Sequence, residues 1–404
     1  MEMDDSSSIE NFQYYPYAGF DFLISRDGQL YFLEANGVAA GIAYVSFVAR
    51  QLGRYVVDKR LLKMLMPNMK LLDRFVQMSI TYYRFKTGSE DDKPLVAITY
   101  PKHGSKFIEW EIRSIRNAFK NHGIEAYIVN KKNARMGKDG YLRIRINGYT
   151  LIPDLIIRRT LNFPDRTRQP MINPREVGEI TKDKWITYKV VRNFLKKHPE
   201  YEGTFKLPET HFISSSNKLI SRVYDMLDAH GSVVVKPVDG CGGKGITFIR
   251  SRKSVEDRLE PMVERTEKRK SSIIVQEEVN VMPFQGFDGH MYAFDLRIYG
   301  LLGRFAGGHV RRSPLPRGSP DKDLEKKCVS NISSGGAFAL LLLGGEKDLT
   351  MVPLTRIAYR FGGEKLPIEG NALILGGKLL ENLRKAVTCI AWAISEAVMK
   401  RKGM

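Results

Sequence analysis

The sequence predicts an α/β protein in which part of the sheet structure is antiparallel, as in α+β folds. Three observations support this prediction. A strand, an amphipathic helix and a second strand follow one another from Leu95 to Val129, the order of a parallel β-α-β unit. A glycine-rich turn joins two strands between residues 232 and 250. A short hairpin with the turn Arg26-Asp27-Gly28 lies near the start of the chain.

The bulk composition is that of an ordinary globular protein of two or three domains. The chain has 404 residues, of which 43% are apolar and 27% charged, enough for sizeable cores. No apolar run approaches the roughly 20 residues of a membrane-spanning helix, and the acidic N-terminus does not resemble a signal peptide. The three cysteines are far apart, so neither a disulfide framework nor a zinc cluster is indicated. We therefore expect a cytoplasmic protein without a membrane partner.

The net charge of +19 is the one unusual bulk property. A strongly basic protein attracts polyanions, which include nucleic acids, acidic membrane surfaces, nucleotides and phosphorylated or carboxylated substrates. Much of the charge lies in mixed stretches such as RKSVEDRLEPMVERTEKRK, which are typical of a solvated helix face. Charge alone therefore does not select a function.

The remaining elements follow in chain order. Helix-compatible apolar spacing runs from Ile42 to Phe85, with a break near Pro67, and the polar stretch KTGSEDDKP that follows is typical of a linker. A hairpin turning at Asn147-Gly148 extends the α/β region. Beyond the glycine-rich turn come the strand SSIIVQEEV, a long hairpin turning at Leu302-Gly303, a polar loop and a final amphipathic helix. These patterns divide the chain into five segments: 1–50, 51–92, 93–175, 176–272 and 273–404.

The stretch VVVKPVDGCGGKG is a candidate phosphate-binding loop. Lys236 ends a strand, and the turn after it adds Lys244 and four glycines, Gly240, Gly242, Gly243 and Gly245. Glycine lets backbone N–H groups approach a phosphate without interference from a Cβ atom. The loop is neither a Walker A motif, which needs Ser or Thr after the lysine, nor a Rossmann turn, which leads into a helix. Alone, it fits a flexible hairpin equally well.

The order of several motifs resembles that of the ATP-grasp superfamily, above all glutathione synthetase and the ribosomal-protein glutamate ligases. The likeness rests on PDLIIRR, INPREVGEITKDK, the Lys-Pro-glycine loop, VQEEV, DLRIYG, VRRS and SNISSGG, which follow one another between residue 93 and about residue 400. It implies an ATP-grasp fold with an α/β pre-ATP-grasp substrate domain at 93–175, a lid subdomain at 176–272 and a core subdomain at 273–404.

One element of that family is missing from its usual place. In ATP-grasp ligases the final helix leads into a G-x-D strand, a turn and a strand ending in E-x-N, which hold magnesium. Here GFD ends at Asp21 and EAN begins at Glu34, 13 positions later and near the N-terminus. That spacing accommodates two antiparallel strands and a tight turn, with Glu34 and Asn36 on one face.

The resemblance therefore implies a circular permutation that makes the metal-binding hairpin N-terminal. Residues 1–50 would complete the ATP-grasp domain, and residues 51–92 would form a helical connector. The alternative is that residues 1–50 are the tail of a lost neighbouring domain, so that the chain has no complete metal site.

The resemblance implies ATP and Mg²⁺ as cofactors, with Mn²⁺ as a substitute metal. Two carboxylates and an amide oxygen suit such hard cations, so the expected metal ligands are Asp21, Glu34 and Asn36. The residues expected to bind ATP are Lys184, Lys236, Gly240, Gly242, Gly243, Lys244, Gly245, Gln276, Glu277, Glu278, Val279 and Asn331. Purely structural interpretations remain open. Asp21 could be a paired acid at a strand edge, and Glu34 with Asn36 a pair that caps a turn. VQEEV could be an ordinary buried edge strand, and Asn331 could cap a loop.

Two arginines are expected to be catalytic, Arg297 in DLR and Arg312 in VRRS. In the family, matching arginines hold the substrate carboxylate or the acyl-phosphate, a task that suits a fixed guanidinium with several donors. Arg311 and Arg312 alternate along one strand, so only one of the two should face the site.

The function that the resemblance implies is an ATP- and Mg²⁺-dependent carboxylate–amine ligase that forms an amide or peptide bond through an acyl-phosphate. Its partners would be small-molecule or peptide carboxylates and amines, which the sequence does not name. One alternative is a kinase of the same fold acting on a polyanionic acceptor such as an inositol phosphate. Another is a non-catalytic nucleotide- or nucleic-acid-binding module, although no aromatic-interleaved basic patch favours nucleic acid. The apolar surface of Ile42–Phe85 suggests a homo-oligomer as a further hypothesis.

Overall fold

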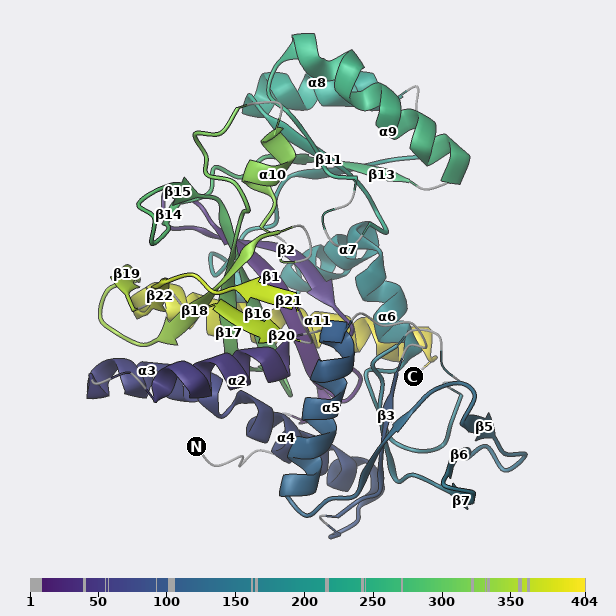
Figure 1. Cartoon of the computed structure of the whole chain (residues 1–404). Helices are drawn as coiled ribbons and strands as arrows, with labels where there is room; N and C mark the ends of the chain where they lie inside the picture. The colour runs from purple at the N-terminus through teal and green to yellow at the C-terminus, as the bar shows by residue number, and fades with distance from the viewer. Residues whose placement is uncertain are drawn as a thin grey trace.

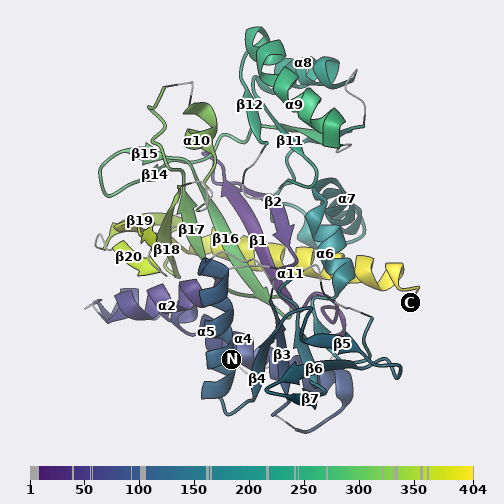
Figure 2. The same ribbon diagram turned by 45° about the vertical axis from the view of Figure 1, so that its right-hand side comes forward.

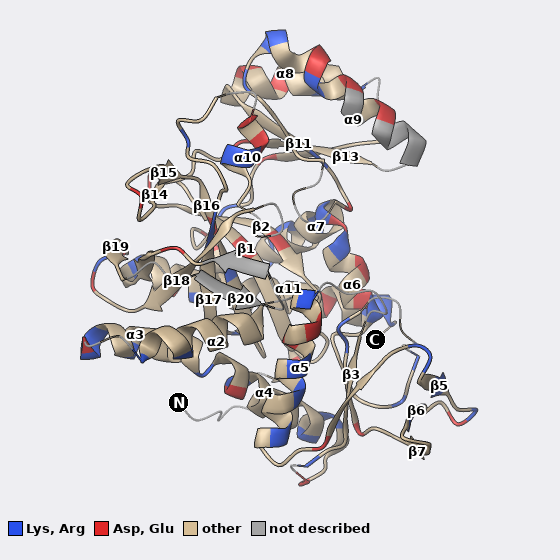
Figure 3. Cartoon of the chain, in the orientation of Figure 1, with Lys and Arg blue, Asp and Glu red and all other residues tan. Residues whose placement is uncertain are grey.

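The computed structural model describes residues 9–403 except for short stretches. Those stretches are 39–40, 55, 57, 92, 101–105, 161–162, 164–165, 215–217, 241–242, 244, 270–271, 321–322, 331, 333–334, 355–357 and 362–363. Within the described part, no helix is both long and apolar enough to cross a membrane. Segments with Lys and Arg occur in all parts of the molecule, with acidic segments among them (Figure 3).

A seven-stranded sheet forms the centre of the molecule (Figures 1 and 2). Its strands, in spatial order, are β19 (Leu349–Pro353), β22 (Asn371–Leu375), β18 (Ala337–Leu343), β17 (Arg304–Arg312), β16 (Phe294–Leu301), β1 (Tyr17–Ile24) and β2 (Leu30–Asn36). All neighbours in this sheet pair antiparallel except β18 and β22. The hairpin from the start of the chain is therefore an integral part of a sheet whose other strands all come from the last third of the chain.

The two faces of this sheet differ in chemistry because side chains alternate along each strand. In the register, Asp21 lies opposite both Glu34 and Arg297. The alternate positions on β1 and β16 are apolar, and Phe20 and Ile298 are fully buried. The apolar face packs against the long helix α11 (Gly377–Arg401), as Gly300 shows, because a Cβ there would lie 3.0 Å from Val387. One face is thus core, and the other is free to carry charged groups.

A smaller antiparallel sheet forms a separate layer, at the top of Figure 1. Its strand order is β10 (Thr210–Ile213), β13 (Ile273–Glu277), β11 (Val233–Pro237) and β12 (Thr247–Ile249). Helices α8 (Leu219–His230) and α9 (Val255–Arg269) cover it and share with it an apolar cluster of their own. The short helix α10 (Leu324–Cys328) lies beside β12.

The β-α-β unit expected from Leu95 is confirmed. Strands β4 (Ala126–Val129), β3 (Val96–Thr99), β8 (Leu155–Ile157) and β9 (Met171–Ile172) form a parallel sheet, with α5 (Lys106–Asn121) between β3 and β4 in the chain. A three-stranded sheet, β5 (Ala134–Met136), β6 (Leu142–Ile146) and β7 (Tyr149–Leu151), extends from it. Its predicted turn is confirmed, because Asn147 and Gly148 both have positive φ, as two-residue hairpin turns require.

Helices connect and cover these sheets. The Ile42–Phe85 region forms α2 (Ile42–Gly53), α3 (Lys59–Met69) and α4 (Leu71–Thr87), and α3 continues past Pro67 to end two residues later. Two further helices, α6 (Arg175–Lys182) and α7 (Lys184–Leu195), pack against α11. The remaining elements are small: η1 (Pro199–Tyr201), η3 (Arg252–Ser254), the hairpin β14 (Phe284–Gln285) with β15 (Met291–Tyr292), and the hairpin β20 (Ala358–Phe361) with β21 (Glu364–Pro367).

The beginning of the hairpin lies against the end of α11. The Tyr14 amide donates a hydrogen bond of 3.3 Å to Ser395 Oγ. The ammonium group of Lys402 lies 5.1 Å from the centre of the Tyr14 ring. The two ends of the described chain are therefore neighbours in space.

One buried asparagine fastens the hairpin to the rest of the molecule. Asn173, between β9 and α6, has φ of 56° and is 1% exposed. Its side-chain amide donates to the carbonyl oxygens of Tyr17 and Gly37, and its Oδ1 accepts from the Tyr17 amide at 3.3 Å. The two ends of the β1–β2 segment are thus held by a single side chain.

We expect Asn173→Ala to lower the free energy of unfolding by about 2–4 kcal/mol, because buried backbone groups lose their partners. The positive φ adds to the cost, since Ala tolerates it less well than Asn. Urea denaturation would measure the change. Asn121→Ala, at the exposed end of α5, is the matched control and should shift stability by no more than about 0.5 kcal/mol. Equal unfolding midpoints for the two variants would contradict the prediction.

Candidate active site

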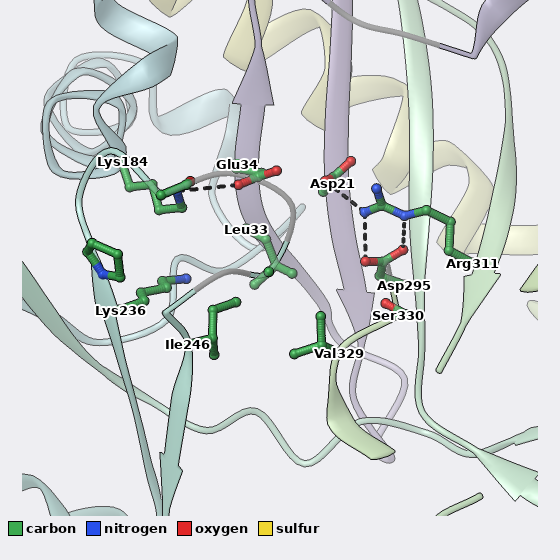
Figure 4. Close-up of a pocket in the computed structure, with 13 residues that line it drawn as sticks. Asp21, Leu33, Glu34, Lys184, Lys236, Ile246, Asp295, Arg311, Val329 and Ser330 are labelled. Carbon is green, nitrogen blue, oxygen red and sulfur yellow. Dashed lines mark hydrogen bonds and ion pairs between the residues drawn. The ribbon is translucent and has the colours of Figure 1, made fainter. Parts of the chain in front are cut away.

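Two adjoining cavities lie between the small antiparallel sheet and the polar face of the central sheet. The inner one, of about 100 Å³, is lined by Asp21, Leu33, Glu34, Lys184, Lys236, Pro237, Gly240, Gly243, Ile246, Asp295, Arg311, Val329 and Ser330 (Figure 4). The outer one, of about 580 Å³, shares six of those residues: Leu33, Lys236, Ile246, Asp295, Val329 and Ser330. Two of the expected metal ligands, Asp21 and Glu34, therefore meet the lysines and loop glycines in one place, whereas Asn36 is not among the residues that line the two cavities.

A buried network of ion pairs runs across β1, β16 and β17. Asp21 accepts two hydrogen bonds from Arg297, at 2.5 and 2.6 Å, and one from Arg311 at 2.8 Å. Arg311 also donates two bonds of 2.7 Å to Asp295. Figure 4 shows its guanidinium between the two aspartates. Burial would raise the pKa of Asp21, but the two guanidiniums outweigh it and hold that pKa below its usual value.

Glu34 lies between this network and two lysines. Its carboxylate is 3.8 Å from the ammonium group of Lys184 and 3.9 Å from Arg297. Burial, and then the negative charge of Asp21, raise the pKa of Glu34 above its usual value. Its side chain is 32% exposed, far more than that of Asp21, and it points into the inner cavity (Figure 4).

The third expected metal ligand, Asn36, lies two residues further along the same face. Its Nδ2 is buried and has no hydrogen-bond partner among the residues described. Its carbonyl oxygen accepts from the Tyr15 hydroxyl at 2.8 Å, which fixes the backbone but leaves the side-chain amide available. Two carboxylates and an amide oxygen are a donor set that suits Mg²⁺. The residues present therefore fit the expected cation.

The expected donor set contains two carboxylates and one amide. Within the described ranges, no group of three or more His, Cys, Asp or Glu side chains is arranged to hold a metal ion. Asp21 and Glu34 lie opposite each other in the β1–β2 register, close enough that each affects the pKa of the other. Asp21 also contacts the two arginines, and Glu34 also lies near Lys184.

Lys236 is held at the end of β11 by a buried hydrogen-bond network. Its ammonium group donates to Gln276 Oε1 at 2.7 Å, and the Gln276 amide donates to Tyr188 and Thr210 at 2.9 and 2.8 Å. Gln276 was expected in the nucleotide wall, and its polar atoms serve chiefly to orient this lysine. Burial, and then the charge of Lys184, lower the pKa of Lys236 to about 7.

The second lysine and the glycine-rich loop complete the inner cavity. Lys184 is the first residue of α7, directly after Asp183, which caps the helix by accepting from the Ile186 amide at 2.9 Å. The Lys184 ammonium donates to the carbonyl oxygen of Gly240 in the loop. Gly243 and Gly245 have φ of 74° and 79°, which favours glycine. Gly242, Lys244 and Asn331 lie outside the described residues.

The outer cavity contains the residues expected to form the nucleotide wall. Glu277, Glu278 and Val279 line it, as does Gln276. Sequence reasoning missed Arg250 and Arg317, which line the same cavity. Arg250 forms an ion pair with Glu278. Neither arginine belongs to a motif, so the sequence offered no signal for them.

Arg311, and not Arg312, faces the inner cavity. The sequence prediction chose Arg312, but its guanidinium lies on the opposite side of β17, where it contacts Glu369 at 2.5 Å and stacks 3.9 Å above the Tyr292 ring. The reason is the register, in which Arg311 lies opposite Asp295. Arg311 therefore shares the face of Arg297. Asp295 was also missed, although its spacing of two from Arg297 in DLR was a usable signal.

Comparison with known proteins identifies the fold. Residues 170–299 match a family model described as YheC/D-like ATP-grasp. A provisionally assigned gamma-glutamylcysteine synthetase from Methylobacillus flagellatus KT has 12% sequence identity to this chain. The alignment covers 98% of this chain and 92% of that one, with a TM-score of 0.59. The chain has the ATP-grasp fold.

Other ligase-like structures are more distant. A glutathione synthetase-like effector from Globodera pallida matches with 11% identity over 76% of each chain, at a TM-score of 0.45. D-alanyl-alanine synthetase A from Vibrio cholerae matches with 10% identity over 57% of this chain and 71% of its own, at a TM-score of 0.38. A search of the curated proteins found no match. The ATP-grasp fold thus rests on the family model and on the Methylobacillus structure.

The lowered pKa of Lys236 generates a prediction about phosphate binding. Above about pH 7 this lysine is largely neutral in the free protein, and a bound polyphosphate would favour its charged form and raise its pKa. Binding of MgATP at about pH 8 should therefore take up as much as about one proton. Calorimetry in two buffers of different ionisation enthalpy measures the uptake.

Lys236→Met serves as the matched variant, because methionine has a similar length and no charge. It should bind MgATP with less proton uptake than the wild type. Identical heats in both buffers for the wild type, or undiminished uptake in the variant, would contradict the assignment.

Proposed function

We propose that the protein is an ATP- and Mg²⁺-dependent carboxylate–amine ligase. One observation supports this most strongly: an acidic hairpin, two lysines and a glycine-rich loop converge on one cavity within an ATP-grasp fold. In the proposed reaction a substrate carboxylate oxygen takes the γ-phosphoryl group of ATP, and ADP leaves. A neutral amine then attacks the carbonyl carbon of the acyl-phosphate, the C–N bond of the amide forms and the C–O bond to the phosphate breaks. The phosphate leaves with the proton that the amine gives up.

The outer cavity suits the base and ribose of ATP, and the inner cavity suits its phosphates. The outer cavity, with the 276–279 segment along one side, offers room for the base and ribose. Lys184, Lys236 and the glycine loop supply positive charge and backbone N–H groups for the phosphates. Asp21, Glu34 and Asn36 are the residues that would hold Mg²⁺. When bound, that ion would supply positive charge that neutralises the phosphates.

Arg311 lines the inner cavity, and Arg297 lies behind it against Asp21. Phosphoryl transfer needs little covalent help from a protein and depends on positioning and on charge stabilisation. Arg297 and Arg311 lie on the same face as the metal-site carboxylates and are held in fixed positions by β16 and β17. They would stabilise negative charge on the transferring phosphoryl group or on the acyl-phosphate.

We further propose that the hairpin is a permuted C-terminal element of the ATP-grasp domain. Its antiparallel pairing with β16 and the contact between Tyr14 and Lys402 at the end of α11 support this. A helix ending at that point would lead into β1 without other rearrangement, and neighbouring ends make a permutation tolerable. The alternative, a passenger tail from a lost domain, does not account for a hairpin paired within the chain's own sheet.

The substrates are a carboxylic acid and an amine of small-molecule or peptide size. The name of the Methylobacillus structure, gamma-glutamylcysteine synthetase, makes amino acids the first acids and amines to test. The second candidate function is a kinase of the same fold, because the net charge of +19 would suit a polyanionic acceptor. A ligase releases ADP and free phosphate only when acid and amine are both present, whereas a kinase needs no amine and leaves the phosphate on its acceptor.

Glu34→Gln tests the proposal directly. We expect Mg²⁺-dependent ATP affinity to fall at least about tenfold, a loss of about 1.4 kcal/mol, because the amide lacks the charge that attracts the metal. Calorimetric titration with ATP in the presence and absence of Mg²⁺ measures it. Glu381→Gln, an exposed glutamate on α11, is the control and should bind as the wild type does. Wild-type affinity in Glu34→Gln would refute the metal role of the hairpin.

A further inference from the structure

We propose that Arg297 occupies the metal-binding carboxylate of Asp21 until a divalent cation replaces it. Cation binding and release of this guanidinium into the cavity would then be one event. The inference rests on the proposed function, because it assigns Asp21 to the metal site. It goes further by naming what the metal must displace and which arginine then becomes free to approach the phosphoryl group.

N–H donors already occupy most of the Asp21 carboxylate. Both of its oxygens accept hydrogen bonds from Arg297, and Oδ2 also accepts from Arg311. A carboxylate offers about four lone-pair positions, and three are taken by N–H donors. The Asp21 side chain is only 3% exposed, so no open side remains for a hydrated cation. A cation can reach this carboxylate only if at least one donor leaves.

The two arginines that hold Asp21 are not equivalent. Arg311 keeps a separate bidentate partner in Asp295, at 2.7 Å for both contacts, whether or not Asp21 is taken. Among the described residues, Asp21 is the one carboxylate to which Arg297 donates hydrogen bonds. The next acidic group is Glu34, whose carboxylate lies 3.9 Å from the Arg297 guanidinium. The Arg297 side chain is also more exposed, at 14% against 7% for Arg311. Arg297 is therefore the donor that leaves.

The charge of the cluster also opposes a metal ion that arrives alone. The inner cavity and its network contain three carboxylates, Asp21, Glu34 and Asp295, which Arg297, Arg311 and Lys184 already match in number. A divalent cation that enters alone therefore gives a poorly solvated site a net positive charge, where repulsion is strong. The polyphosphate offsets that charge. Metal without nucleotide should consequently bind weakly, with Arg297 competing against it.

The test measures Mn²⁺ binding without nucleotide, from the loss of the free Mn²⁺ signal in electron paramagnetic resonance. We expect Arg297→Gln to bind Mn²⁺ at least tenfold more tightly than the wild type, because the competing cation is gone while Arg311 still supports Asp21. The double variant Arg297→Gln/Glu34→Gln should lose this gain, which locates the bound ion at the hairpin. Circular dichroism and thermal unfolding establish that each variant is folded.

Arg312→Gln is the matched control. It removes a largely buried arginine–carboxylate pair on the neighbouring strand but away from the cavity, and should leave Mn²⁺ affinity unchanged. If Arg297→Gln does not fold, Arg297→Lys replaces it. A lysine makes one contact where arginine makes two, so Mn²⁺ affinity should lie between those of the wild type and the neutral variant.

Unchanged or weaker Mn²⁺ binding in both Arg297 variants would overturn the inference. MgATP titration of the wild type and of Glu34→Gln tests the ligase proposal separately. If the wild type binds MgATP through Glu34 while Arg297 variants gain no Mn²⁺ affinity, only the exchange of arginine for metal is wrong. If the wild type does not bind MgATP at all, the proposed function fails first.

Discussion

The antiparallel pairing of β1 with β16 is the interaction on which the rest of the site depends. It aligns Asp21 with Arg297 and, through β17, brings Arg311 within 2.8 Å of the same carboxylate. A slip of one residue would turn these charged groups into the apolar layer against α11 and expose the phenylalanines. The register is therefore specified from both faces, by ion pairs on one side and by hydrophobic burial on the other.

Local patterns in the sequence predicted the elements whose chemistry is local. The turn Arg26-Asp27-Gly28 predicted the hairpin, and the strand–lysine–glycine pattern predicted Lys236 at a strand end with its loop, because each is determined within about fifteen neighbouring residues. The match of Asp21, Glu34 and Asn36 to a metal site came from the resemblance to the ATP-grasp superfamily. The choice between Arg311 and Arg312 was different. Alternation shows that one of them faces the site, but only the register with Asp295 on β16 decides which. Arg250 and Arg317 reach the outer cavity through tertiary packing, which no local pattern encodes.

For Gln276 too, a local pattern predicted the position of the residue but not the contacts of its side chain. Its place in VQEEV indicated a wall of the nucleotide site, and it does line the outer cavity. Its side chain, however, makes three hydrogen bonds, to Lys236, Tyr188 and Thr210. Those partners come from three separate elements, so their convergence is a product of folding. A buried amide that is fully satisfied orients the lysine without adding charge, which lets desolvation lower the lysine pKa.

The buried charges explain why this fold needs its hairpin. Arginines and lysines left without carboxylates in a desolvated cavity would strongly destabilise the folded state. Asp21 and Glu34 supply two of the three acidic groups in this cluster, and both come from β1 and β2. A chain without the hairpin would lose these partners and two strands of the central sheet together. Stability and the proposed metal site thus draw on the same carboxylates. A cation that takes Asp21 in the proposed exchange must therefore arrive with new negative charge for the arginine that it displaces.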